Sequence, residues 1–232
     1  MKLRLVCTIT AVAMAGISAA QSDDAKQKIA TLKAAVQKSN EAQRLYEWIE
    51  TTVVSAKGEE KSRKQQRCYY GADGALQRVE VSEDHADGGR APRGIRGKIV
   101  AAKKEEMTDY MKQAVELVKS YIPPDASRIQ AAESAGKIAI RPSGTGKPVT
   151  LEINDYKVPG DVLSLTLDLE NNYVTALGVQ SLLGEERDPV TMNVRFDRLN
   201  DGTAYPAQTD LEASAKQIAV TVQNSGYRKT AP

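Results

Sequence analysis

This chain of 232 residues has few of the side chains from which catalytic and metal sites are built. It holds only two cysteines and a single histidine, His85. With one histidine and no close carboxylate cluster of the calcium-loop kind, we expect no metal site. Cys68 and His85 are the only candidates for a thiol nucleophile and its base, and no third group at a suitable spacing orients them. We therefore expect a partly buried thiol, a solvent-exposed histidine, no cofactor, no catalytic residue and no enzyme activity.

Aromatic residues and an excess of one charge are also scarce. Aromatic side chains make up 5% of the chain, and 32 basic residues face 30 acidic ones. A nearly neutral chain with few aromatics does not favour nucleic-acid binding.

The stretch PSGTGKPV at 142–149 resembles a phosphate-binding loop only in part. Such a loop needs a glycine five residues before its second glycine, a Ser or Thr after the lysine, and a following helix. Here Arg141 takes the first position and Pro148 follows Lys147. We expect a hairpin turn between two strands at Ser143–Gly146, and no nucleotide site.

Long hydrophobic runs are absent after the first residues. Lys2 and Arg4 precede an apolar stretch at 5–17, and small residues follow at 18–20. This layout predicts a secretory signal peptide at 1–20, which is too short to span a bilayer. We expect cleavage near Ala20 and a soluble, exported protein in the periplasm or outside the cell. Cys68 then remains alone, so an internal disulfide is excluded.

The rest of the chain, 21–232, is predicted to form one domain. An Ala-, Lys- and Gln-rich stretch from Asp23 to about Leu45 has helical spacing. Three strands follow at 46–54, 60–70 and 75–81, separated by glycine-containing turns. A glycine-rich segment at 83–98 has no apolar period, which predicts a mobile loop.

A helical insert is predicted at 99–135. Its main helix, 99–122, places methionines and tyrosines on one face and charges on the other, and Pro123 and Pro124 end it. Asp125 is placed to cap a short second helix that Gly136 ends.

From Lys137 onward, apolar and polar residues alternate in segment after segment, separated by short turns. Strict alternation predicts strands with one buried and one wet face, which is antiparallel sheet geometry. The pattern lacks the strand–helix–strand repeat of doubly wound nucleotide folds. We therefore predict an α+β fold. It is a strongly curved antiparallel sheet, or half-barrel, with the N-terminal helix and the inserted helix covering its concave face.

A basic run lies beside the predicted loop. It contains Arg90, Arg93, Arg96 and Lys98 with no acidic residue among them. Such a run is suited to contact an anionic membrane surface or an acidic partner. Alternatively, it is a solvated loop that nearby acidic residues partly neutralise.

The apolar stripe of the 99–122 helix has two interpretations. It is either fixed core packing or the face of a lid that moves when an apolar ligand enters, because methionine adapts to different neighbours. In both cases the apolar hollow is lined by residues from the helix and from the strands: Trp48, Met107, Tyr110, Met111, Val115, Val118, Leu165, Leu167, Met192, Val194 and Phe196.

The order of elements resembles a known family. An N-terminal helix, a meander containing YYGADGALQRVEV, an inserted helix and a closing stretch VRFDRLNDGTAYPAQTDLEASAKQIAVTVQNSGY are similar to the half-barrel of LolA-like periplasmic lipoprotein carriers. The closing stretch is more similar still to uncharacterised exported bacterial proteins of this layout. The resemblance implies an apolar hollow that holds acyl chains under helical lids. No polar gating residue of the family matches here, and the 83–135 insert is larger than the usual one.

Two functions remain open at this point. The first is a non-catalytic cell-envelope protein that binds or carries an apolar ligand, such as a lipid or an acylated protein. The alternative is a scaffold or partner-binding module whose hollow is filled by its own helix.

Overall fold

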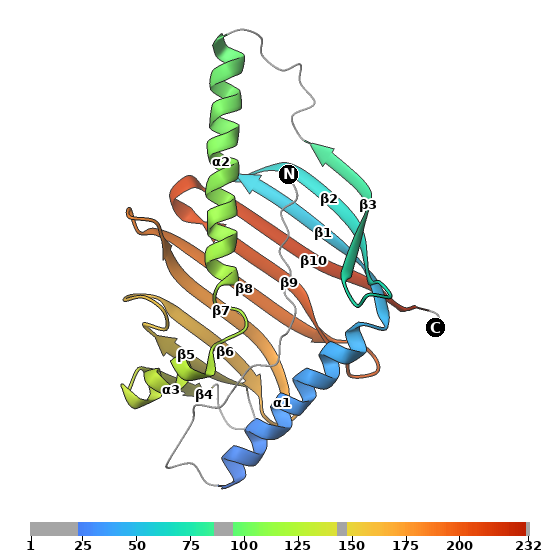
Figure 1. Ribbon diagram of the computed structural model, residues 1–232, viewed down its shortest axis with the longest axis vertical. Helices are drawn as coiled ribbons and strands as arrows, with labels where there is room; N and C mark the ends of the chain where they lie inside the picture. Colours follow the sequence, from blue (N-terminus) through green and yellow to red (C-terminus); the bar gives the residue numbers. More distant parts are fainter. Residues whose placement is uncertain (1–22, 86–94, 143–147, 231–232) are drawn as a thin grey trace.

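The computed structural model describes residues 23–85, 95–142 and 148–230 (Figure 1). Within them, one ten-stranded sheet carries three α-helices. The helices are α1 (Asp23–Gln43), α2 (Ile95–Lys119) and α3 (Ala126–Ser134). The first strands are β1 (Tyr46–Ala56), β2 (Glu59–Tyr70), β3 (Leu76–His85), β4 (Ile138–Pro142) and β5 (Val149–Asn154). The others are β6 (Val162–Asp168), β7 (Tyr173–Leu183), β8 (Asp188–Arg198), β9 (Ala204–Ala213) and β10 (Ile218–Lys229), and the short 3₁₀ helix η1 (Ser214–Lys216) precedes β10.

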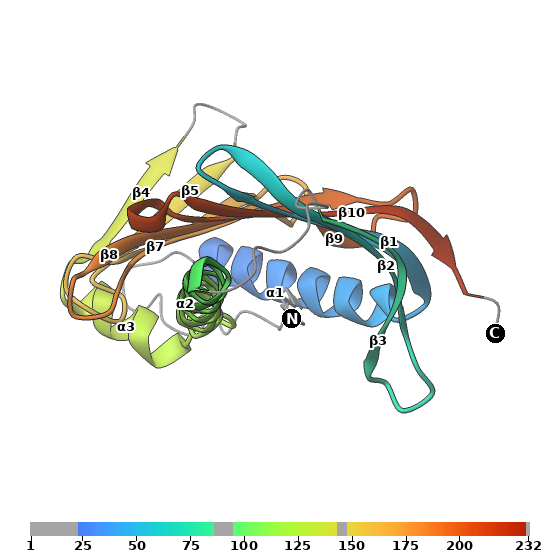
Figure 2. The ribbon, with the colours of Figure 1, turned by 90° about the horizontal axis from the view of Figure 1, so that it is seen from above.

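All neighbouring strands pair antiparallel, in the order β3-β2-β1-β10-β9-β8-β7-β6-β5-β4. The sheet is open, with β3 and β4 at its two edges. Figure 2 shows that it curves over α1 and α2, which lie together on its concave side. The predicted α+β half-barrel with helices on the concave face is therefore confirmed.

The connection between β3 and β4 determines where α2 lies. These strands are consecutive in the chain but occupy opposite edges of the sheet. The chain between them must therefore pass from one edge to the other, and α2 and α3 form part of this connection. In the folded chain α2 lies beside β7, β8 and β9, α1 beside β7 and β9, and α3 beside β5.

Alternating sequence patterns explain the central strands. Leu163, Leu165 and Leu167 on β6 are buried, while Ser164 and Thr166 between them are not. β8 repeats this arrangement with alternate buried apolar residues. Because successive side chains of a strand point to opposite faces, these residues form one continuous apolar surface on the concave side.

The boundaries of the predicted loop and helix are corrected by the structure. β3 runs to His85, so residues 83–85 belong to a strand, and residues 86–94 lie outside the described part of the chain. The β2–β3 ladder is extended by charged side chains, since Lys64 pairs with both Glu80 and Glu83. Because these paired residues are charged, the sequence shows no apolar alternation from which this extension could be predicted. α2 begins at Ile95 and ends at Lys119, so the predicted 99–122 helix is shifted towards the N-terminus.

Two strands were not recognised in the sequence. β7 alternates poorly because a bulge interrupts its pairing with β6 and because Gly178 replaces a side chain there. A Cβ atom at Gly178 would lie 2.4 Å from the Ser164 hydroxyl oxygen, so any other residue here would force the Ser164 side chain to move. β9 contains Pro206 beside a second bulge, which is where a sheet interior tolerates proline.

The short helices and turns follow local chemistry. Asp125 caps α3, and its Oδ1 accepts hydrogen bonds from the N–H groups of Ser127 at 2.8 Å and Arg128 at 3.4 Å. Gly136 follows the helix with a φ of 67°, a left-handed conformation that glycine adopts without strain. The predicted hairpin turn at 143–146 lies outside the described residues, although β4 and β5 on either side of it pair antiparallel.

Candidate binding site on the concave face

The concave face of the sheet carries the main apolar cluster of the described residues. Its buried strand residues come from six neighbouring strands, β5 to β10. They include Leu163, Leu165, Leu167, Val174, Leu177, Val179, Val190, Met192, Val194, Phe196, Leu211, Ile218, Val220 and Val222. The predicted lining residues Leu165, Leu167, Met192, Val194 and Phe196 are thus brought together on one face.

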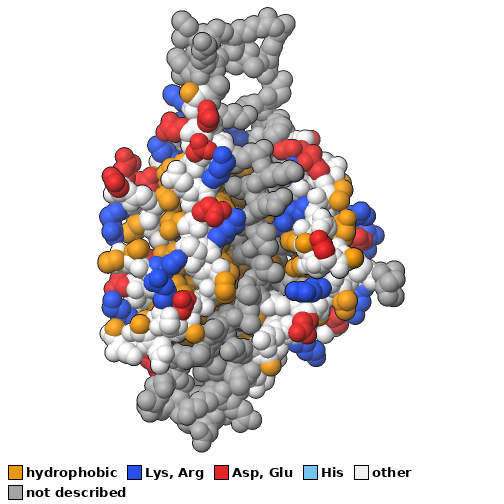
Figure 3. Space-filling view, in the orientation of Figure 1, with side chains coloured by type: hydrophobic (Ala, Val, Ile, Leu, Met, Phe, Trp, Pro, Cys, Tyr) orange, Lys and Arg blue, Asp and Glu red, His pale blue; other side chains and the backbone are white. Residues whose placement is uncertain are grey.

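α2 covers part of this surface. Met111, Val115 and Val118 lie at helical spacing, and each is at most 3% exposed. Met107 and Tyr110, one turn earlier, are only half-buried and pack at the border of the cluster. Acidic and basic side chains are interspersed along the outward face of the helix (Figure 3). The predicted division of this helix into an apolar and a charged face is therefore correct.

A buried polar contact holds the C-terminal end of α2. The hydroxyl group of Tyr121 donates to Asp161 Oδ2 at 2.5 Å and lies 2.8 Å from the Ser181 hydroxyl oxygen. The backbone N–H groups of Lys157 and Val158 donate to the same carboxylate oxygen at 2.9 and 3.0 Å. Burial, and then the hydrogen bond to Asp161, raise the pKa of Tyr121 above its usual range. This end of α2 is consequently tied to the β5–β6 turn and to β7.

A second contact, at the middle of α2, is more exposed. Tyr110 donates from its hydroxyl group to Asp188 Oδ2 at 3.0 Å. Burial first, and then Asp188, raise the pKa of Tyr110 to about 12. Lys216 lies over the Tyr110 ring and pairs with Glu106 at 3.5 Å. Exposed pairs of this kind are worth little, so the middle of α2 is held less firmly than its C-terminal end.

Trp48 lies elsewhere on the sheet. Its ring stacks on that of Tyr227, with centroids 5.4 Å apart, and its Nε1 donates to Asn224 Oδ1 at 3.0 Å. Tyr70 and Tyr205 complete this aromatic cluster on β1, β2, β9 and β10. Trp48 is buried, but it does not belong to the apolar cluster that α2 covers. That Trp48 or any other predicted lining residue binds a ligand stays a prediction.

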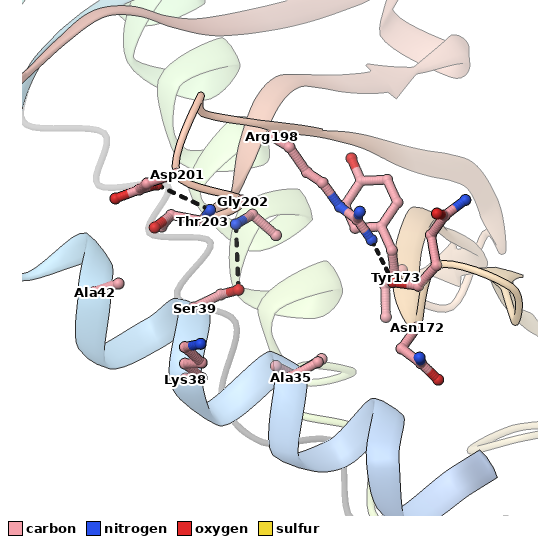
Figure 4. Close-up of a pocket in the computed structure, with 14 residues that line it drawn as sticks. Ala35, Lys38, Ser39, Ala42, Asn172, Tyr173, Arg198, Asp201, Gly202 and Thr203 are labelled. Atoms are coloured by element: carbon pink, nitrogen blue, oxygen red, sulfur yellow. Dashed lines mark hydrogen bonds between the residues drawn. The ribbon is translucent and has the colours of Figure 1, made fainter.

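A crevice of about 240 Å³ lies between α1 and the turns that join β6 to β7 and β8 to β9 (Figure 4). The guanidinium group of Arg198 lies 4.2 Å from the centre of the Tyr173 ring and donates from Nη2 to the Asn171 carbonyl oxygen at 2.7 Å. Burial first, and then the charge of Asp197, raise the pKa of Tyr173 to about 12. No pattern in the sequence indicated this crevice, because its walls are turns and helix residues from three distant segments.

The backbone positions of Cys68 and His85 lie far apart on the sheet. Cys68 is fully buried on β2, and burial raises the pKa of its thiol to about 12. His85 pairs in register with Ser62, six residues along β2 from Cys68, which is roughly 20 Å at about 3.3 Å per residue. Among the described residues, no three His, Cys, Asp or Glu side chains are grouped so that they could hold a metal ion.

The basic run is only partly visible. Arg90 and Arg93 lie outside the described residues, and Arg96 and Lys98 are described only as backbone within α2. The predicted signal peptide also lies outside them. No helix in the described ranges has the length and apolar character needed to cross a membrane. Contact of the basic run with an anionic surface stays a prediction.

No protein-family model matches this chain, and no curated protein matches it. Several solved structures are similar in fold. A LolA superfamily protein from Nitrosomonas europaea is 11% identical, with a TM-score of 0.35 over 87% of this chain and 94% of that one. A putative outer membrane lipoprotein-sorting protein domain from Vibrio parahaemolyticus is 8% identical, with a TM-score of 0.35 over 85% and 92%. A DUF1329 family protein from Desulfovibrio piger is 8% identical, with a TM-score of 0.34 over 87% and 92%. At these TM-scores the chain is similar to LolA-like half-barrels in the layout of its fold, and nothing about its ligand follows from them.

Proposed function

We propose that this protein is a non-catalytic cell-envelope protein that binds an apolar ligand, a lipid or an acylated protein, in the hollow of its half-barrel. One observation carries the proposal. The apolar surface continues from β8 and β9 onto Val220 and Val222 of β10 and Val54 of β1. The principal helix contacts, by contrast, are with β5, β7, β8 and β9. This face is buried in the structure, since Val220 and Val222 are 1% and 4% exposed, so an apolar ligand would take the place of what covers it.

The contacts along α2 support the proposal that it is a lid fixed at its C-terminal end. Tyr121 and Asp161 tie its C-terminal end through buried hydrogen bonds, whereas the contacts at Tyr110 and Glu106 are half-buried or exposed. In Figure 1 the N-terminal part of α2 projects past the sheet. Movement of the N-terminal half about the fixed end would widen the hollow without breaking the Tyr121 contact.

The alternative is a scaffold whose hollow is filled by its own helix. The observation in its favour is the close packing of the central α2 residues, since Met111 is 3% exposed and Val118 is fully buried. A helix packed this closely needs no ligand to complete the core.

Two measurements distinguish these functions. Native mass spectrometry with lipid extraction, on protein purified from its own cell envelope, should find a co-purifying lipid or acyl chain. A fluorescent fatty-acid analogue should bind the parent protein, and Met111→Ala should alter its binding, whereas exposed Lys112→Ala on the same helix should not. If the parent protein binds no probe and carries no lipid, the scaffold function remains.

A further inference from the structure

We propose that the crevice between α1 and the β6–β7 and β8–β9 turns is a binding site for the anionic end of a short amphiphile. The ligand is a carboxylate or phosphate group that carries an apolar chain. This site is distinct from the concave hollow and does not depend on what the hollow binds. The crevice has a volume of about 240 Å³.

The inner wall of the crevice is apolar because α1 presents small residues there. Ala35, Lys38 and Ala42 recur at helical spacing on the side of α1 that faces the turns (Figure 4). The two alanines leave the space open, and Val36 and Val174 behind them are buried. An alkyl chain placed here would contact the alanines and Val36 of the helix and Val174 of β7, beside the polar side chain of Ser39.

The frame around the crevice is held by side-chain contacts to the backbone. Ser39 accepts a hydrogen bond from the Ala204 N–H at 3.2 Å, and the Gln43 amide donates to the Ala204 carbonyl oxygen. Both polar side chains are less than 9% exposed. These contacts fix the distance between α1 and the start of β9, so the crevice does not close by a simple approach of the helix.

Two exposed cations and one carboxylate line the crevice, and the charges of Asp168 and Asp197 act nearby on Arg198 and Tyr173. Lys38 and Arg198 line it, and in the described part of the chain neither lies within 4.0 Å of a carboxylate oxygen. Asp201 is the carboxylate of the lining, and both of its oxygens are occupied. Oδ1 accepts from the Thr203 N–H at 3.1 Å, and Oδ2 accepts from Tyr46 at 2.6 Å and pairs with Lys229 at 3.3 Å.

Arg198 is the better placed of the two cations. Its contact with the Tyr173 ring and the bond from Nη2 to the Asn171 carbonyl hold the guanidinium group in the lining of the crevice. A guanidinium group has five N–H donors, so donors remain for a carboxylate or phosphate. Apolar side chains with a held cation beside them suit an amphiphilic anion.

Calorimetric titration of the full protein tests the site with four probes: octanoate, octyl phosphate, octanol and acetate. We expect saturable binding of octanoate or octyl phosphate at about 1 mM or tighter, and at least about tenfold weaker binding of octanol and acetate. A preference for one of the two anions identifies the head group. The absence of saturable binding by both anions overturns the proposal.

Substitutions locate the bound anion. Arg198→Gln should weaken octanoate binding at least about tenfold. Arg195→Gln, an exposed arginine of the same strand outside the crevice, should leave it unchanged. If Met111→Ala alters octanoate binding while Arg198→Gln does not, the anion lies in the hollow and the crevice proposal fails, whatever the outcome for the hollow.

A substitution that fills the crevice distinguishes a binding site from a packing gap. Ala42→Leu should abolish octanoate binding, with the matched helix substitution Ala131→Leu on α3 as control. If Ala42→Leu does not fold, as judged by circular dichroism, Ala35→Val serves in its place. A folded, more stable Ala42→Leu variant that still binds octanoate as the parent does would show that the crevice is only a gap.

Discussion

Cys68 lies on β2 opposite Trp48 of β1 and Arg78 of β3. The curvature of the sheet and the aromatic cluster bury it completely, although β2 is otherwise a polar strand with exposed and half-buried residues. Desolvation, and after it the nearby charge of Glu50, raise the pKa of the thiol from 9.0 to about 12. The thiol is therefore protonated at neutral pH and inert as a nucleophile.

This burial predicts low reactivity and a defined pH dependence. Cys68 should resist alkylation by iodoacetamide at pH 8 in the folded protein and react once urea unfolds it. Because the folded pKa lies above the unfolded one, the thiol stabilises the fold fully below about pH 9. That contribution is lost as the pH rises towards 12. Peptide mapping after alkylation measures the modification at Cys68. Equal rates in the folded and unfolded protein would contradict the burial.

At the scale of elements, α2 is held unequally along its length. Its C-terminal end is tied by Tyr121, whose hydroxyl group donates to Oδ2 of the buried Asp161 carboxylate. The contact through Tyr110 is half-buried and reaches Asp188 at the rim. A buried hydrogen bond to a charged group contributes more than one that water can replace.

Tyr121→Phe should therefore lower the free energy of unfolding by about 2 kcal/mol, because Asp161 loses a donor that no solvent replaces. Tyr110→Phe is the matched control and should cost less than about 1 kcal/mol. Urea denaturation followed by circular dichroism measures both. If the two substitutions cost the same, Tyr121 is not the fixed end of the helix.

At the scale of the whole molecule, the sheet is completed by its most distant segments. β1 pairs with β10 from Tyr46 and Lys229 to Ala56 and Ile218, so the meander β1–β2–β3 joins the sheet through the last strand of the chain. The apolar cluster also draws on α1, α2, α3 and six of the strands. Among the described residues, the meander β1–β2–β3 contributes only the partly buried Val54 to this cluster, so the meander has no large apolar core of its own.

A single cooperative unfolding transition is expected for this reason. The fluorescence of Trp48, the one tryptophan, reports the aromatic cluster at β1 and β10, while far-UV circular dichroism reports all helices and strands. The two signals should change at the same urea concentration. An earlier fluorescence change would show that β1–β3 unfold as a separate unit.

Much of this architecture could be predicted from local patterns. The alternation of Leu163, Leu165 and Leu167 identified β6, and Asp125 followed by Gly136 bounded α3. The apolar stripe through Met111 identified the buried face of α2. Each of these signals lies within a dozen residues, because strand and helix periods act on neighbours in the chain.

The features that depend on distant neighbours were decided by the tertiary structure. Pairing of β1 with β10, passage of α2 between opposite edges, and the stacking of Trp48 on Tyr227 all join residues far apart in the sequence. β7 was not recognised because Gly178, which lies close to the Ser164 side chain of β6, interrupts its apolar alternation. The crevice is likewise formed by α1 and two turns, and no local sequence pattern marks Arg198 as part of it. The sequence by itself determined the α+β class and the buried faces, since periodicity is local. The tertiary structure alone decided which faces and turns meet, since burial and strand pairing act across the chain.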